Sequence, residues 1–478
     1  MSPYRTEEQQ KEIAEYFKYK DIDYVACWYA KASDFIQGTD TRCAFVSTNS
    51  ITQGEQVSPL WRRMNATIDF AYRTFKWSNE AKGKAAVHCV IVGFCVGGKN
   101  LVQSSQSPQS GEGETSRTSR EIKSEALHDL HVSTCSTRLK TIYDSDGTAI
   151  SASNINGYLM DAPDVFVEVR TRPLCDVPQM RNGNVPLDGD ALKIDPEDYP
   201  QFTDCPFTKR LMGGRELLHG EERYVLWLVN AEPTEVRKYP FVLKRIELCR
   251  ENRLKMKDAG TRRLAESPMT FRDTCNPASY IAIPLVSSEK RKYVPIAFLD
   301  GNTIATNQIQ IIPDASLYHF GILTSRMHNA WMRAVAGRLK SDYRYSKDIV
   351  YNNFIWPEIE NVANVKVLPI SNINSQLGCT EKLETGNTGT GNISTLATLI
   401  TRAAQAVLDA RAAHPGSTLA DLYDPLAMPA DLRKAHDSLD ALVDKAYGLK
   451  PSCSDAERVA HLFRLYVNRV NKDRSQNE

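Results

Sequence analysis

The sequence lacks long apolar runs and a charge excess of either sign. No stretch approaches the roughly 20 apolar residues that a membrane helix needs, and the Lys- and Glu-rich start is not a signal peptide, so we expect a cytoplasmic protein. The formal net charge is +1 over 478 residues. A polyanionic partner must therefore meet a local basic face and not a uniformly basic protein.

The common catalytic signatures are also missing. There is no Walker-type GxxxxGK[ST], no GxGxxG after a strand, no HExxH and no GxSxG. The 11 cysteines include no CxxC pair, which favours reduced thiols over a disulfide framework or a zinc site. We predict no metal site, because His128 and His131 lie in a polar stretch and Asp164 is spaced too tightly from Glu168. No Pro-Cys pair occurs, which excludes cytosine C5 methylation with its cysteine nucleophile.

Alternating helix and strand patterns over residues 1–100 predict one side of an open α/β sheet. Apolar residues recur at helical spacing from Tyr24 to Ile36 and stop at Gly38, a natural helix terminator. Three apolar runs read as buried strands. They are Cys43–Ser47, Ile68–Tyr72 and Val87–Phe94.

The rest of the chain divides by composition. Residues 101–150 are expected to be a variable insertion or linker, because 103–120 have almost no apolar content. Residues 151–358 predict a mixed α+β domain and 383–392 a second linker. Residues 394–472 predict a small helical domain. The expected elements are strands at Tyr224–Val229, Ile281–Val286 and Ile309–Ile312, a charged helix at Leu243–Leu264, and helices at Leu396–Ala413, Ala430–Tyr447 and Asp455–Val470, the last opened by a capping box of Ser454 and Glu457.

Several long, unusual strings in a fixed order carry a family resemblance. They are AFVSTNSITQGEQV (44–57), RTFKWSNEAKGKAAVHCVIVGF (73–94), DAPDVFVEVRTRPLC (161–175), LYHFGILTSRMHNAWM (317–332), SDYRYSKDIVYNNFIWPE (341–358) and TLADLYDPLAMPADLRKAHDSLDALVDKAYG (418–448). Together they resemble the MmeI-like (type IIG/IIL) adenine-specific class I DNA methyltransferases. The resemblance covers nearly the whole chain, and the insertion at about 100–135 is the main departure from it.

The resemblance implies a fold class and an activity. The fold is the C-terminal half of a Rossmann-like methyltransferase sheet, then a mixed α+β target-recognition domain and a helical C-terminal domain. The activity is methylation of adenine N6 in double-stranded DNA with S-adenosylmethionine, in a restriction-modification or phage-defence system. The glycine-rich cofactor loop and the Asn-Pro-Pro-Tyr/Phe motif of such enzymes are not in the sequence. We therefore expect the C-terminal portion of a methyltransferase; the alternatives are a non-catalytic DNA specificity subunit or a truncated fragment, with a separate chain binding the cofactor.

Candidate site residues for the target base lie near the first two strands. A flipped adenine needs an aromatic slot, and Phe75 and Trp77 are the candidates, in a polar loop between two strands. The equally weighted alternative is packing at the edge of the sheet. Asn49, Gln53 and Gln56 are candidates for contacts to the flipped nucleotide or its strand, against capping of the next helix by other residues of this turn, namely Ser50 or Thr52.

Basic clusters interleaved with tyrosine predict the DNA face. Phosphates attract such clusters, and tyrosines suit stacking; the alternative is a solvated charged surface. Lys340 and Asp342 fit one G·C pair, because the ammonium donates to guanine O6 and N7 and the carboxylate accepts from the cytosine amine. An internal surface ion pair is the alternative for these two. Besides the charged helix, the clusters are Lys290, Arg291 and Lys292, and Arg338, Lys340, Asp342, Arg344, Tyr345 and Lys347, near Tyr293 and Tyr343.

Overall fold

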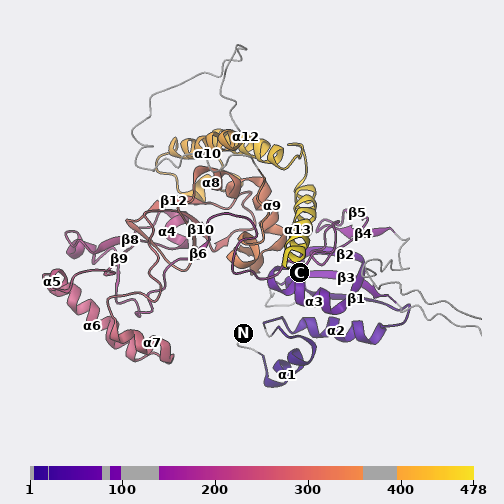
Figure 1. The fold of residues 1–478 in the computed structure, drawn as a ribbon, viewed down its shortest axis with the longest axis horizontal. Helices are drawn as coiled ribbons and strands as arrows, with labels where there is room; N and C mark the ends of the chain where they lie inside the picture. The colour runs from indigo at the N-terminus through magenta and orange to yellow at the C-terminus, as the bar shows by residue number, and fades with distance from the viewer. Residues whose placement is uncertain (1–4, 20, 78–86, 98–138, 359–395, 478) are drawn as a thin grey trace, which may run out of the picture. The chain divides into compact units, whose positions relative to one another are not determined.

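The computed structural model describes residues 5–19, 21–77, 87–97, 139–358 and 396–477 (Figure 1). These residues cluster into two compact units. The first holds Met1–Thr52 and Gln56–Phe166, and the second holds Gln53–Glu55 and Val167–Glu478. Among the described residues, none of the helices has the length and apolar character required to cross a membrane. His128, His131, residues 103–120 and residues 383–392 lie outside the described residues.

The first unit is a five-stranded sheet with helices. The strand order is β1-β3-β2-β4-β5, and β3 runs antiparallel to both of its neighbours, so β1 and β2 run parallel to each other. The three predicted strands are confirmed, and the second extends well beyond the predicted Ile68–Tyr72 at both ends. The elements are α1 (Glu7–Tyr16), α2 (Val25–Ile36), β1 (Arg42–Thr48), the 3-10 turns η1 (Asn49–Thr52) and η2 (Gly54–Gln56), α3 (Val57–Met64), β2 (Ala66–Lys76), β3 (His88–Val96), β4 (Lys140–Tyr143) and β5 (Ala149–Ala152).

An aromatic cluster fixes α2 on one face of this sheet. Tyr29 of α2 is fully buried, and its ring lies 5.1 Å from the ring of Phe45 in β1 and 5.7 Å from that of Phe94 in β3, centroid to centroid. The Tyr29 hydroxyl lies 3.0 Å from Ser47 Oγ. The helix ends before Gly38, whose φ of +77° costs glycine little, as predicted.

Part of the predicted linker at 101–150 is instead a part of this sheet. β4 pairs in parallel with β2, and β5 pairs with β4. Ile142 at the centre of β4 is fully buried. The two strands are short and follow a polar segment, so the local composition predicted a linker and did not indicate that the chain rejoins the sheet.

The second unit begins with three small sheets, whose strand orders are β12-β10-β14-β6, β13-β8-β9-β7 and β11-β16-β15. The predicted strands at Tyr224, Ile281 and Ile309 are confirmed. The strands are β6 (Arg181–Asn182), β7 (Lys193–Ile194), β8 (Thr208–Met212), β9 (Tyr224–Leu226), β10 (Ser279–Pro284), β11 (Val286–Ser287), β12 (Ala297–Asp300), β13 (Thr303–Ala305), β14 (Ile309–Pro313), β15 (Gly337–Leu339) and β16 (Asp342–Arg344).

The predicted continuous helix at Leu243–Leu264 was wrong. The chain forms α6, then breaks at Lys255–Asp258, because the Asp258 side chain caps a new helix by accepting from Thr261 N at 2.6 Å. The helical elements of this part are η3 (Tyr199–Phe202), α4 (Gly214–His219), α5 (Pro233–Val236), α6 (Pro240–Leu254), α7 (Ala259–Arg263), η4 (Leu264–Glu266), α8 (Leu317–Thr324), α9 (Arg326–Val335) and a π-helix, η5 (Lys347–Tyr351).

The predicted C-terminal helices are confirmed and pack within the second unit. Helix α10 lies against α8 and α12, and α13 lies against α9. Ser454 and Glu457 form the predicted capping box, with Ser454 N donating to Glu457 Oε2 at 2.6 Å and Glu457 N donating to Ser454 Oγ at 3.2 Å. The helices are α10 (Leu396–Ala412), α11 (Leu419–Leu422), α12 (Ala430–Ala446) and α13 (Asp455–Asn477).

Candidate nucleic-acid interface

The sheet of the first unit brings its two candidate segments to one edge. Cys89 of β3 pairs with Thr48 at the end of β1 and with Phe75 near the end of β2. Because β1 and β2 are parallel, their carboxyl ends meet here, where open α/β sheets place ligands. The turn after β1 therefore faces the same edge as the aromatic pair.

The two candidate aromatics differ in exposure. Phe75 is half-buried within β2, not in a loop as predicted, because the strand continues to Lys76. Trp77 follows the strand and is 46 % exposed, while its backbone N–H donates to Val87 O at 2.9 Å. The ring centroids lie 6.4 Å apart at a tilt of 40°. Trp77 is therefore the more exposed of the two rings, with Phe75 beside it.

The turn after β1 is held by its own polar side chains. Asn49 is 9 % exposed, and its Nδ2 lies 3.4 Å from Thr74 Oγ1, beside Phe75. The Gln56 amide is occupied on both sides, since Oε1 accepts from Asp23 N at 2.6 Å and Nε2 donates to Asp21 O at 2.9 Å. Asn49 and Gln56 thus hydrogen-bond within the protein at this edge and do not project from it.

Helix capping does not explain this turn. In the described chain, α3 begins after Gln56 without a side-chain cap, so neither Ser50 nor Thr52 caps it. Ser50 Oγ donates to Asp23 Oδ2 at 2.8 Å, and Thr52 Oγ1 donates to Asn49 O at 2.9 Å. Gln53 is half-buried and belongs with the second unit.

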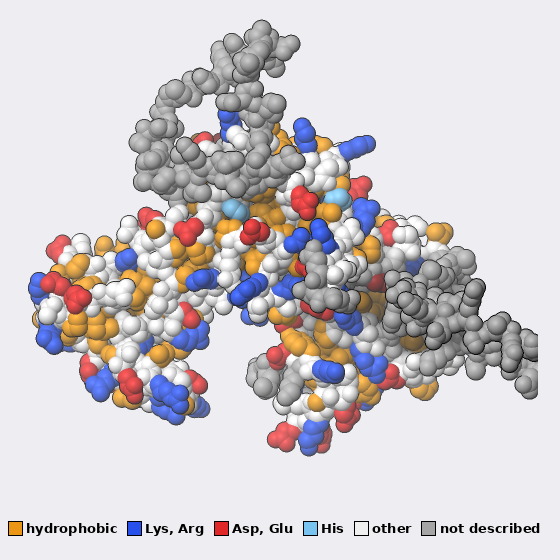
Figure 2. All heavy atoms as spheres, viewed as in Figure 1, with side chains coloured by type: hydrophobic (Ala, Val, Ile, Leu, Met, Phe, Trp, Pro, Cys, Tyr) orange, Lys and Arg blue, Asp and Glu red, His pale blue; other side chains and the backbone are white. Residues whose placement is uncertain are grey.

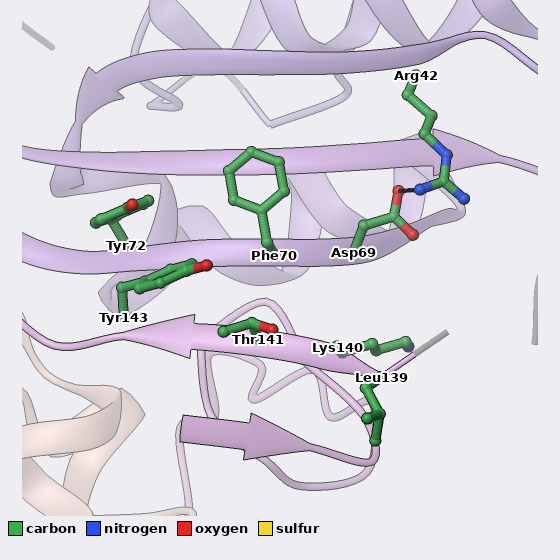
Figure 3. A pocket seen from close by; sticks show the side chains of 8 residues that line it. All are labelled: Arg42, Asp69, Phe70, Tyr72, Leu139, Lys140, Thr141 and Tyr143. Atoms are coloured by element: carbon green, nitrogen blue, oxygen red, sulfur yellow. Dashed lines mark ion pairs between the residues drawn. The ribbon is translucent and has the colours of Figure 1, made fainter. Parts of the chain in front are cut away.

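A shallow hollow of about 330 Å³ lies on the sheet of the first unit (Figure 3). Phe70 lies over Gly93, where a Cβ would be 2.1 Å from the ring. Arg42 and Asp69 form an ion pair at 3.5 Å. The lining comes from the start of β1, from residues 69–72 of β2 and from residues 139–143 at β4, and not from the carboxyl ends of β1 and β2, so we assign the hollow no role in the candidate site. The full lining is Arg42, Asp69, Phe70, Tyr72, Leu139, Lys140, Thr141 and Tyr143.

The strongest candidate for base contacts is the hairpin of β15 and β16, called here the recognition hairpin (337–344). Arg338 pairs with Tyr343 across it. The Arg338 guanidinium lies 4.1 Å from the Tyr343 ring centroid and donates to Glu289 Oε2 at 3.2 Å. The side of the hairpin that carries Arg338 and Tyr343, called here the back face, therefore packs against the protein. Arg338, predicted to contact DNA, instead joins the hairpin to the turn that follows β11.

The opposite face of the recognition hairpin is open. Directly opposed residues of an antiparallel pair point to the same side, so Leu339 and Asp342 share this front face with Arg344, while Lys340 occupies the turn. Within the described chain, Lys340, Arg344 and Lys290 have no ion-pair partner, and the predicted alternative of a Lys340–Asp342 ion pair does not form. These three cations and Asp342 are the predicted residues that the structure leaves available.

The tyrosines between the basic clusters are not available for stacking. Tyr293, Tyr343 and Tyr345 are 1 %, 8 % and 2 % exposed. The Tyr345 hydroxyl lies 2.9 Å from His328 Nε2, and burial raises the pKa of Tyr345 well above its usual value. Tyr345 is a core residue in this structure, because its hydroxyl finds a buried partner that the local sequence does not reveal.

Several predicted cations are used inside the protein. Arg253 of α6 is fully buried and donates to five backbone carbonyls, those of Pro186, Leu187, Leu264, Ser267 and Thr270. Lys347 lies 2.5 Å from Asp348 Oδ1. Basic and acidic side chains are interspersed over α5, α6 and α7 (Figure 2), so this region is not a uniformly basic stripe.

Arg291 and Lys292 of the basic turn (290–292) begin an irregular segment, residues 291–296, that is held by helices. Arg333 of α9 donates to the carbonyls of Arg291 and Lys292. The Tyr293 hydroxyl donates to Asp440 Oδ2 of α12 at 2.7 Å. The carbonyl of Ile296 accepts from Arg411 of α10 at 2.7 Å. These contacts join residues far apart in the chain, so no local sequence pattern indicates them.

Burial shifts the pKa of two groups at this segment, Arg291 within it and Asp440, which contacts it. The pKa of Asp440 is raised to about 6 by burial, although Tyr293 and the backbone N–H of Arg326 donate to its oxygens. Burial lowers the pKa of Arg291, and Asp342 opposes that shift. Lys292 Nζ lies 3.3 Å from Asp437. Lys290 alone of the three cations in this turn is exposed without an ion-pair partner among the described residues.

Asp440→Asn tests the buried carboxyl. The pKa of Asp440 is higher in the folded chain than the usual 3.8, so its protonation favours the folded state as pH falls from about 7 to 4. Relative to Asp440→Asn, the natural protein should gain up to about 3 kcal/mol of unfolding free energy over this interval. Urea unfolding at several pH values measures it. The exposed neighbour Asp437→Asn is the control, and equal pH profiles for the natural protein and Asp440→Asn would contradict the assignment.

Comparison with known proteins identifies the family. The chain matches the models described as MmeI DNA-methyltransferase domain over residues 2–106, MmeI target recognition domain over 161–358 and MmeI C-terminal domain over 396–472. It is 36% identical over 456 residues to DNA methyltransferase A of Bacillus subtilis (strain 168), covering 94% of this chain and 44% of that protein.

A solved structure has the same fold. The type IIL restriction-modification enzyme MmeI, in complex with DNA, matches with a TM-score of 0.76 and 37% identity, over 98% of this chain and 55% of that one. The chain thus spans about half the length of the relatives it matches. With three matching domains in order and this shared fold, the chain belongs to the MmeI-like family of DNA methyltransferases.

Proposed function

We propose that this chain serves a site-specific DNA adenine-N6 methyltransferase of a restriction-modification or phage-defence system. The observation that carries the proposal is the front face of the recognition hairpin. Arg344 on that face and Lys340 in the adjoining turn have no ion-pair partner among the described residues, and Asp342 is the adjacent acceptor. A family member solved with DNA supports duplex DNA as the partner.

The end of the hairpin suits the major groove. Strand β11 pairs with β16 only at Arg344 and Tyr343, so the hairpin continues from Leu339 to Asp342 as a two-stranded ribbon. Such a ribbon fits that groove, and base edges there offer both acceptors and donors. Lys340 donates to guanine O6 and N7, and Asp342 accepts from the cytosine amine of the same pair. Lys290 lies in the turn that Arg338 joins to the hairpin through Glu289, where its ammonium is suited to a phosphate.

The target base is proposed to leave the helix and stack on Trp77. Methyl transfer to an exocyclic amine forms no covalent bond with the enzyme, so the site needs a stacking surface and hydrogen-bond acceptors rather than a nucleophile. Trp77 is 46 % exposed at the carboxyl edge of the sheet. Asn49, through Thr74, positions the end of β2 that carries the ring. Gln53 remains a proposed contact to the displaced strand.

S-adenosylmethionine is the methyl donor that the family implies. A cofactor cradle needs glycines whose missing Cβ leaves room for the ligand. In the described first unit, Gly93 and Gly157 lie instead against the rings of Phe70 and Trp61. Gly38 follows a helix end, and Gly147 lies in the short turn between β4 and β5. We therefore assign none of the described residues to the cofactor.

Removing the free cations tests the DNA face. The triple variant Lys290→Ala, Lys340→Ala and Arg344→Ala should bind duplex DNA more weakly. Its slope of log affinity against log salt should be shallower by about 0.9 for each phosphate that the variant no longer neutralises. Fluorescence anisotropy across a salt series measures both. Lys450→Ala, an exposed lysine beyond α12, is the matched control, and an unchanged slope in the triple variant would reject this face.

Exchanging the charges of the hairpin tests base recognition. Lys340→Glu with Asp342→Arg reverses donor and acceptor, so the preferred pair should change from G·C to C·G, by about 10- to 100-fold in affinity. Sequencing the duplexes selected from a randomised pool measures the preference. Retention of the original preference by the folded variant would exclude these residues from base recognition.

Trp77→Ala tests the stacking surface. In an enzyme with a complete methyltransferase domain, this variant should lose the fluorescence increase of 2-aminopurine at the target position, because the displaced base has no ring to hold it. Trp28→Ala removes an exposed tryptophan of α2 and should keep the signal. If the fluorescence of the Trp77 variant equals that of the natural enzyme, Trp77 is not the slot.

A further inference from the structure

Leu339 is a large apolar side chain at the end of the recognition hairpin. It is 56 % exposed, and a single exposed leucine needs no explanation by itself. Its position does. Leu339 pairs directly with Asp342, so both side chains lie on the front face, next to the turn residue Lys340.

The front face leaves Leu339 free to meet a ligand. The residue two before it on the same side is Gly337, where an added Cβ would meet no described atom within 4 Å. Arg338, between them, points to the back face and is engaged with Glu289, Ser341 O and the Tyr343 ring. The hairpin is therefore fixed from behind, while Leu339 stands beside an open space.

The major groove offers one apolar group on its base edges, the C5 methyl of thymine. Opposed side chains on a hairpin are roughly 5 Å apart at Cβ, and stacked bases are about 3.4 Å apart. Leu339 therefore addresses a base pair neighbouring the one that Asp342 addresses. We propose that Leu339 is a specificity-determining residue that contacts the methyl group of a thymine beside the G·C pair. This inference rests on the proposed DNA recognition.

Replacing thymine by uracil removes that methyl group alone. The chain is first used to select its preferred duplexes, and each thymine of the selected site is then replaced singly by uracil. The natural chain should bind one uracil duplex about four-fold more weakly, the value of one buried methyl group. Leu339→Ala should bind the thymine and uracil duplexes equally. The two changes together form a cycle between one side chain and one methyl.

The control and the contrary outcomes are distinct. Leu426→Ala removes a leucine that is 97 % exposed and should keep the four-fold ratio. The inference is overturned if no uracil replacement weakens binding, or if Leu339→Ala retains the same ratio as the natural chain. Both outcomes leave the proposed function standing when Lys340 and Arg344 variants still lose affinity. Absence of any DNA binding by the folded natural chain would overturn both proposals.

Discussion

The position of the basic turn at Lys290, Arg291 and Lys292 depends on an irregular segment, residues 291–296, whose polar groups are satisfied by side chains of distant helices. Buried backbone groups outside a sheet must find other partners. Here Arg333 and Arg411 supply donors to its carbonyls, and Asn329 Oδ1 accepts from Val294 N at 2.8 Å. Tyr293 adds a buried bond to Asp440. Helices α9, α10 and α12 thus determine where the basic turn lies.

In the first unit, the antiparallel strand β3 determines where the candidate residues lie, because it pairs with both β1 and β2. It separates β1 from β2 yet leaves their carboxyl ends at one edge, through the shared partner Cys89. Alternation in β1 directs Phe45 and Ser47 toward Tyr29 of α2. The burial of one face therefore fixes the register, and the register fixes which side chains reach the edge.

Sequence patterns predicted the elements with strong periodicity. They did not predict the burial of side chains whose partners are distant in the sequence. The strands of the first unit and the three C-terminal helices follow from local apolar patterns. The burial of Tyr293 depends on Asp440, 147 residues away. The burial of Arg253 depends on carbonyls from two segments, one before it at Pro186 and Leu187 and one after it at 264–270. A basic or aromatic residue in the sequence is equally compatible with an exposed position and with a buried, hydrogen-bonded one. The side of the hairpin on which Arg338 lies could not be predicted without the pairing register of β15 and β16.

The two faces of the recognition hairpin have separate physical tasks. Arg338 holds the back face through three contacts: an ion pair with Glu289, a hydrogen bond to Ser341 O and its position over the Tyr343 ring. The front face presents side chains that the described chain does not use for packing. Substitutions on the front face then change which bases are favoured without removing contacts that hold the hairpin. Alternation along a β-strand, with a period of two residues, is sufficient to keep stability and specificity on different sides of the same eight residues.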